Sequence, residues 1–159
     1  MRPLIIIMNI KILRNPGFAG FLILTILTSN CKSTYTNRDQ GVSGRVFWVE
    51  GNQMPPQNES ELTGVKKTLY VYELTDLSQV AGRPPLFDMV KTQLLTTIKT
   101  DSRGRFKQPL EPGSYSIFVK EKTKFFANQF NTQGLIQSIE IKSGQWENLI
   151  IKINYAASY

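Results

Sequence analysis

The side chains that could do chemistry in this 159-residue chain are few, because the sequence has no histidine and one cysteine. Without histidine there is no Ser-His-Asp or Cys-His arrangement for nucleophilic catalysis, and no zinc site of the usual nitrogen and sulfur ligands. A single cysteine cannot form an intramolecular disulfide. The sequence therefore predicts no catalytic residue, no metal and no cofactor, and a domain stabilised by packing alone.

The twelve acidic residues are the remaining candidates for a reactive site. Asp101, Asp88 and Glu111 could supply calcium ligands, but calcium takes about six to eight oxygens and Arg103 lies inside the Asp101 loop. We therefore interpret Asp101 as a residue that stabilises a turn. A pair of acids acting on a glycosidic bond stays open, because such a pair is brought together in space and not by sequence spacing.

The lysines at positions 120, 122 and 124 would share one face of a strand that continued past Val119. With Lys142 or Lys152 they could form a basic stripe. We expect these charges to protect a strand edge from pairing with another sheet. Contact with anionic lipid or lipopolysaccharide is the functional alternative.

Most large aromatic residues are expected in the core, since a domain of this size needs about that many large side chains. The exception is a predicted loop over residues 121–134, in which phenylalanines lie among Asn and Gln residues. An exposed aromatic surface there could bind a sugar. The residues of this candidate binding loop are Phe125, Phe126, Asn128 and Phe130.

Residues 1–30 have the order of a secretory signal peptide, with Lys11 and Arg14 before an apolar run over residues 18–27. At about 1.5 Å per residue this run covers about half of the hydrocarbon core of a bilayer, so a transmembrane helix is not expected. Met8 is an alternative start that gives a more typical signal.

The residues before Cys31 resemble a relaxed bacterial lipobox, and they are Leu27, Thr28, Ser29 and Asn30. In a lipobox the cysteine thiol forms a thioether to diacylglycerol, and two or three acyl chains anchor a protein stably where one would be marginal. The resemblance implies an exported lipoprotein of the cell envelope, most simply of the outer membrane. Residues 32–35 lack the acidic stretch that often accompanies surface export, which favours a periplasmic-facing orientation.

The net charge of the mature protein is modest. Three of the nineteen basic residues and none of the acidic ones precede Cys31, so a formal charge of +7 falls to +4 when that segment is removed. This value is ordinary for a soluble domain and indicates no nucleic-acid partner.

After the lipidated cysteine and a polar tether (residues 31–40), the chain reads as short strands separated by turns. Strands are predicted at residues 42–50, 67–74, 91–99, 135–142 and 146–155, with a hairpin over 100–120 and a tail at 156–159. Residues 67–74 are apolar on both faces and should form a central strand. Turn and anchor residues of the hairpin are Asp101, Gly104, Phe106, Pro112, Gly113 and Tyr115. About seven strands predict an all-β sandwich.

Five motifs recur at the turns and strands of the predicted domain: GVSGRV at 41–46, TDSRGRF at 100–106, LEPGSYSI at 110–117, IEIKSG at 139–144 and LIIKI at 149–153. Together they resemble the carboxypeptidase regulatory-like family of transthyretin-like (prealbumin-like) Greek-key β-sandwiches. The resemblance covers residues 41–155 and is strongest to small lipoproteins of the Bacteroidetes group. Zinc ligands of the peptidases belong to another domain, and the Tyr-Arg-Gly-Ser tail of 5-hydroxyisourate hydrolases is replaced here by NYAASY at 154–159.

The first functional hypothesis is a non-catalytic, lipid-anchored envelope protein that acts as a binding or structural module for another envelope protein or a glycan. Loops on a rigid sandwich are the usual place for recognition, so residues 51–64, 75–90 and 121–134 would carry specificity. The alternative is a carboxylate-dependent glycan hydrolase, which would require two carboxylates about 5 to 10 Å apart in a cleft.

Overall fold

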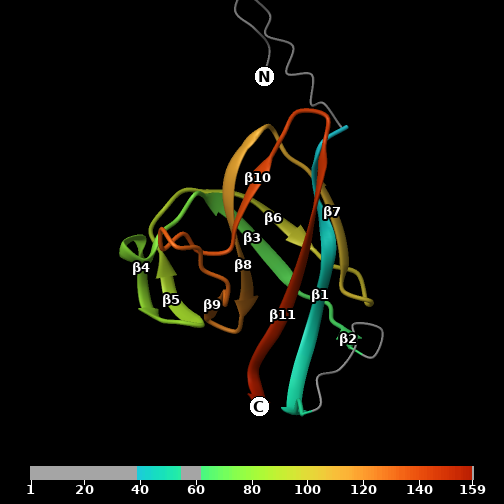
Figure 1. The fold of residues 1–159 in the computed structure, drawn as a ribbon, viewed down its shortest axis with the longest axis vertical. Coiled ribbons are helices and arrows are strands. Elements are labelled where there is room, and N and C mark those ends of the chain that lie inside the picture. Colours follow the sequence, from blue (N-terminus) through green and yellow to red (C-terminus); the bar gives the residue numbers. More distant parts are fainter. Residues whose placement is uncertain (1–38, 55–61, 159) are drawn as a thin grey trace, which may run out of the picture. The chain divides into compact units, whose positions relative to one another are not determined.

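The computed structural model describes residues 39–54 and 62–158. The predicted signal peptide, Cys31 with its lipobox and most of the tether lie outside these residues, as does part of the 51–64 loop. The described residues contain no α-helix and form two sheets consistent with a β-sandwich, which confirms the predicted all-β class (Figure 1).

The first sheet is built on β1 (Gly41–Asn52), which pairs in parallel with β11 (Trp146–Ser158). Its other edge pairs antiparallel with two short strands, β2 (Thr63–Gly64) and β7 (Arg105–Pro109). Figure 1 shows β1 and β11 side by side along most of their length. The first and last long strands of the domain are therefore neighbours.

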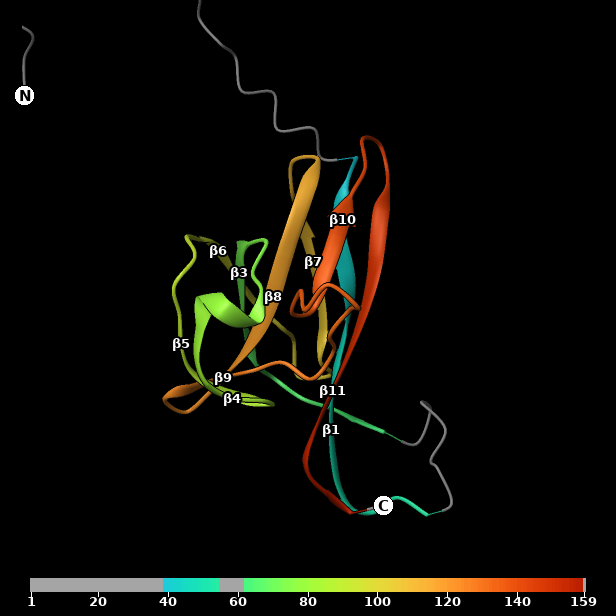
Figure 2. The same ribbon diagram turned by 60° about the vertical axis from the view of Figure 1, so that its left-hand side comes forward.

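The second sheet is centred on the pair β3–β8 and has seven strands. Its order is β4–β5–β9–β8–β3–β6, and β10 pairs with the start of β8 (Figure 2). The strands are β3 (Thr68–Glu73), β4 (Val80–Arg83), β5 (Leu86–Val90), β6 (Leu94–Lys99), β8 (Gly113–Glu121), β9 (Lys124–Phe126) and β10 (Ser138–Ile141). As predicted, the strand over 67–74 is central, because β8 and β6 flank it.

The two faces of β3 and β8 belong to two different hydrophobic cores. One face supplies aliphatic residues to a core that it shares with the first sheet, which we call the inner core: Leu69, Val71, Ile117 and Val119, against Val42, Val46, Ile151 and Ile153. The opposite face supplies Tyr72 and Phe118 to an outer, more aromatic core completed by Phe87, Ala127 and Ile136. Alternation of side chains along a strand accounts for this division.

The outer core explains why two predicted loops are partly wrong. Residues 75–90 contain a short 3-10 helix, η2 (Leu77–Gln79), followed by β4 and β5, and residues 121–134 contain β9. These segments supply Phe87 and Phe125 to the outer core. The described residues consequently form eleven strands, more than the predicted seven or so. The strand predicted over 135–142 shortens to β10.

Candidate functional site

Asp101 holds the turn between β6 and β7. Its Oδ1 accepts hydrogen bonds from the backbone N–H groups of Arg103 and Arg105, both at 2.8 Å. These bonds, that of Arg105 above all, lower the pKa of the Asp101 carboxyl because they stabilise its charged form. Gly104 follows with φ +75°, and a Cβ at this position would collide with the carbonyl oxygen of Val46. The Asp101 carboxylate therefore stabilises this turn through its bonds to the backbone.

The other hairpin residues also have structural contacts. Phe106 packs in the inner core, and Gly113 begins β8 after the exposed Pro112. The hydroxyl of Tyr115 donates to the carbonyl oxygen of Glu111 at 2.8 Å. Burial, and then the nearby Glu111 carboxylate, raise the pKa of Tyr115. The hairpin is a scaffold.

The candidate binding loop does not present its aromatic residues together. Phe126 is fully buried in the inner core and Phe125 is half-buried in β9, so the expectation of an exposed Phe125–Phe126 surface is wrong. Asn128 donates from Nδ2 to the carbonyl oxygen of Lys152 at 3.1 Å and to Oδ1 of Asn154 at 2.9 Å, which ties the segment to β11. Only Phe130 of the four is exposed, with 39% of its surface accessible.

The three lysines of the predicted basic stripe have different surroundings. Lys124 forms an ion pair of 2.8 Å with Asp88, and Lys122 lies in the turn between β8 and β9 with φ +51°. The Lys120 ammonium lies 3.8 Å from the centroid of the Phe125 ring and donates to the carbonyl oxygen of Thr123 at 3.1 Å. Lys120 therefore has contact partners that differ from those of Lys122 and Lys124.

Lys120 instead lines a cavity of about 440 Å³ together with residues from two other strands. We call this cavity the lysine hollow; its lining residues are Lys66, Lys67, Thr68, Lys99 and Lys120. The register of the sheet assembles it, since Thr68 at the start of β3 is directly opposite Lys99 at the end of β6. Lys120 comes from the neighbouring β8.

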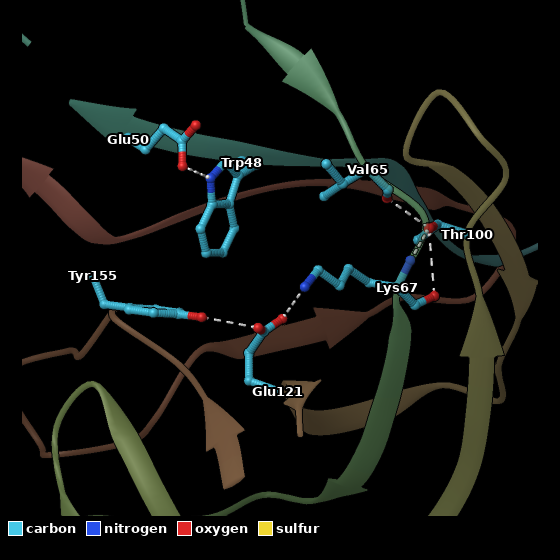
Figure 3. Close-up of polar contacts among 7 residues, drawn as sticks. All are labelled: Trp48, Glu50, Val65, Lys67, Thr100, Glu121 and Tyr155. Carbon is cyan, nitrogen blue, oxygen red and sulfur yellow. Dashed lines mark hydrogen bonds and ion pairs between the residues drawn. The ribbon is translucent and has the colours of Figure 1, made fainter. Parts of the chain in front are cut away.

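Among the described residues, Lys67 is the one lysine of the hollow with an acidic partner. Its Nζ pairs with Oε1 of Glu121, a buried residue that also accepts a hydrogen bond of 3.0 Å from the Tyr155 hydroxyl (Figure 3). Desolvation first, and then the bond to Glu121, raise the pKa of Tyr155. The Lys67 ammonium also lies 5.3 Å from the ring centroid of Trp48. The hydrogen bond between Tyr155 and Glu121 joins β11 of the first sheet to β8 of the second. The ion pair with Glu121 and the contact with Trp48 hold Lys67 toward the space between the two sheets.

Thr100 fixes the backbone beside this ion pair. Its hydroxyl accepts a hydrogen bond of 2.7 Å from the Lys67 N–H and donates to the carbonyl oxygen of Val65 at 2.9 Å (Figure 3). Thr100 is buried, so these bonds are shielded from water. Residues 65–68 are thereby held against the end of β6.

The remaining charges of the hollow are uncompensated within the part of the chain that the structure describes. No carboxylate there pairs with Lys66 or Lys99, both of which are exposed, and Lys120 contacts a ring and a carbonyl oxygen. Neighbouring like charges cost stability, and no described carboxylate offsets that cost for Lys66 and Lys99. The sequence did not reveal this group, because its members come from three separated segments.

Acidic residues do not gather in the same way. The lysine hollow contains no carboxylate, and a second cavity, of about 310 Å³, contains only that of Glu111. Among residues 39–54 and 62–158 there is no group of three or more His, Cys, Asp or Glu side chains that could hold a metal. Over the same residues, no helix is long and apolar enough to cross a membrane.

Comparison with protein-family models, with curated proteins and with solved structures finds no match to this chain. Function must therefore be argued from the residues and the geometry alone.

Proposed function

We propose that this protein is a non-catalytic, lipid-anchored component of the cell envelope that binds an anionic partner, a glycan or another envelope protein, through the lysine hollow. The observation that carries the proposal is the convergence of Lys66, Lys99 and Lys120 on one cavity without a paired carboxylate in the described residues. An ammonium group is a strong donor to phosphate and carboxylate oxygens.

The fold supports this role. Thr68, Lys99 and Lys120 of the hollow belong to paired strands. The contacts of Lys120 with Phe125 and Thr123 reduce the side-chain entropy that this lysine loses when a partner binds. The hollow offers no carboxylate or thiol beside its lysines that could act as a general base or a nucleophile. Binding suits this composition better than hydrolysis.

We propose that the sandwich belongs to the carboxypeptidase regulatory-like family, with the Greek-key, transthyretin-like arrangement that its motifs imply. The β6–β7 turn with Asp101 and Gly104, and the β8 start at Gly113, fall where the TDSRGRF and LEPGSYSI motifs require turns. The anchor at Cys31 would hold the domain at the periplasmic side of the outer membrane.

The anchor is tested by Cys31→Ser. We expect the variant to lose labelling by a radioactive fatty acid and to leave the membrane fraction. A wild-type protein that carries no lipid label and fractionates as before would contradict the lipoprotein assignment.

Recognition is tested by a pull-down from native membranes with the anchor intact, repeated at increasing salt concentration. We expect a co-purifying envelope component that is released by salt, because exposed ionic contacts are screened. A partner that resists salt and is not displaced by a soluble polyanion would show that another surface binds it.

A further inference from the structure

Three residues that line the lysine hollow lie in one row across the second sheet. Thr68 of β3 is directly opposite Lys99 of β6. On the other side, the pairing of Leu69 with Val119 brings Thr68 opposite Lys120 of β8. Neighbouring strands are about 5 Å apart, so the Cα atoms of Lys99 and Lys120 are about 10 Å apart with Thr68 between them.

The side chains of this row point to the outer face of the sheet. Their neighbours in the chain, Leu69, Ile98 and Val119, are buried in the inner core. Because successive side chains of a strand point to opposite faces, the row points away from the inner core. Lys66, two residues before Thr68, lines the hollow with them.

The donors of this group are available to a ligand. Among the described residues, no hydrogen bond engages the hydroxyl of Thr68, and no carboxylate pairs with Lys66 or Lys99. The Lys120 ammonium contacts a ring and one carbonyl oxygen, which leaves further N–H donors free because an ammonium has three. The hollow therefore offers one hydroxyl and three ammonium groups.

This set of donors matches a phosphate monoester better than a carboxylate. A phosphate monoester carries a charge of about −1.5 to −2 at pH 7 and has three acceptor oxygens, so it can accept from several ammonium groups at once. A carboxylate carries one charge, and its two oxygens are best matched by the planar fork of arginine, which the lining lacks. The volume of about 440 Å³ also leaves room for the molecule that carries the phosphate.

We propose that the lysine hollow binds a phosphate monoester. Lys66, Lys99 and Lys120 neutralise its charge, and the Thr68 hydroxyl donates to one of its oxygens. The inference rests on the proposed function, because it names the class of anion that the hollow takes. The same group occurs on sugars, in lipid headgroups and as free phosphate.

The test is calorimetric titration of the full chain in detergent with glucose 6-phosphate, glucuronate and glucose. We expect glucose 6-phosphate to bind at least tenfold more tightly than glucuronate, which bears a carboxylate on the same ring, and glucose not to bind. Lys99→Gln weakens the binding of glucose 6-phosphate about tenfold, as expected for a lost charged hydrogen bond, whereas Lys142→Gln leaves it unchanged. Glycerol 3-phosphate and inorganic phosphate are compared with glucose 6-phosphate, and the tightest of the three assigns the source to a lipid headgroup, free phosphate or a sugar.

Thr68→Val separates direct contact from general attraction, because it removes a hydroxyl and no charge. We expect about a tenfold loss of glucose 6-phosphate binding. Thr97→Val is the matched control, since Thr97 is an exposed threonine of β6 that does not line the hollow, and it leaves binding unchanged. Valine is β-branched and suits a strand, so both variants should fold; if Thr68→Val does not, Lys99→Gln decides.

The outcomes distinguish this inference from the proposed function. Equal affinity for glucose 6-phosphate and glucuronate, with both weakened by Lys99→Gln, would overturn the phosphate assignment and leave the hollow an anion site. Undiminished phosphate binding in folded Thr68→Val or in Lys99→Gln would also overturn it. So would the absence of binding of every phosphate probe while heparin still binds in a manner that depends on Lys99. If heparin binding is absent as well, the proposed function itself is wrong.

Discussion

The turn at Asp101 and the lysine hollow are both groups of charged residues at strand ends, but their charges are used differently. At the turn, the Asp101 carboxylate accepts two backbone N–H groups, so the fold itself satisfies the charge. In the hollow, Lys66 and Lys99 have no carboxylate partner among the described residues. A charged group that is hydrogen-bonded within the fold stabilises the fold. Charged groups that lie together without a carboxylate partner in the described residues are available to bind another molecule.

The ion pair between Lys67 and Glu121 lies between these two extremes. It lines the hollow through Lys67, yet Glu121 and Tyr155 bind that lysine into the contact between the sheets. An ion pair with a neighbouring residue can thus make a charged side chain less available for binding at a site. The following four changes test the distinction, in order of expected effect on stability.

Gly104→Ala should be the most damaging change at the turn. The position has φ +75°, and a Cβ would meet the carbonyl oxygen of Val46, which β1 cannot move easily. We expect a loss of about 3 kcal/mol or more in the free energy of unfolding, measured by denaturant titration. A loss below about 1 kcal/mol would mean that the turn tolerates another backbone conformation.

Glu121→Gln should separate stability from charge in the hollow. It breaks a largely buried ion pair, so we expect a loss of about 2 kcal/mol in unfolding free energy. The change also removes a negative charge beside the hollow, so binding of a soluble polyanion such as heparin should strengthen. Tyr155→Phe, which removes only the hydroxyl donor, is the milder control. Weaker polyanion binding in Glu121→Gln would contradict the assignment of the hollow.

Asp101→Asn should change stability in a pH-dependent way. The folded protein lowers the pKa of Asp101, so the charged carboxylate stabilises the fold above its unfolded pKa of about 3.9. This contribution is lost as the pH falls through the lower, folded value. We expect the variant to melt a few degrees below the wild type at neutral pH, and the difference to shrink below about pH 4. A constant difference across that range would assign the effect to geometry and not to charge.

Lys99→Gln should have the smallest effect on stability, within about 0.5 kcal/mol and in the stabilising direction, because it relieves repulsion among exposed lysines. Polyanion binding should nevertheless weaken. Lys142→Gln, an exposed lysine that does not line the hollow, is the matched control. If both variants weaken binding equally, net charge and not the hollow is responsible.

Local patterns predicted the scaffold well. Period-two alternation located β1, β3, β6, β8 and β11, and the Asp-Gly and Pro-Gly signals located the turns of the hairpin. These features depend on residues near one another in the chain. The parallel pairing of β1 with β11 and the outer core depend on contacts between distant segments, which no local period reveals.

The candidate sites were harder to predict for the same reason. The lysine pattern at positions 120, 122 and 124 indicated a basic surface that includes Lys120, but its partners in the hollow, Lys66 and Lys99, lie in distant segments of the sequence. Cys31 lies outside the described residues, and its lipidation stays a prediction.

The most direct test of the central claim is the recovery of the membrane partner by full-length, anchored protein carrying Lys66→Gln and Lys99→Gln, with the melting temperature measured on the same sample. We predict that partner recovery is lost while the melting temperature is unchanged or raised, and that Lys142→Gln and Asp101→Asn still recover the partner. Undiminished recovery by the double variant, or a loss of recovery accompanied by an equal loss of stability, would contradict the claim that the hollow is a binding site.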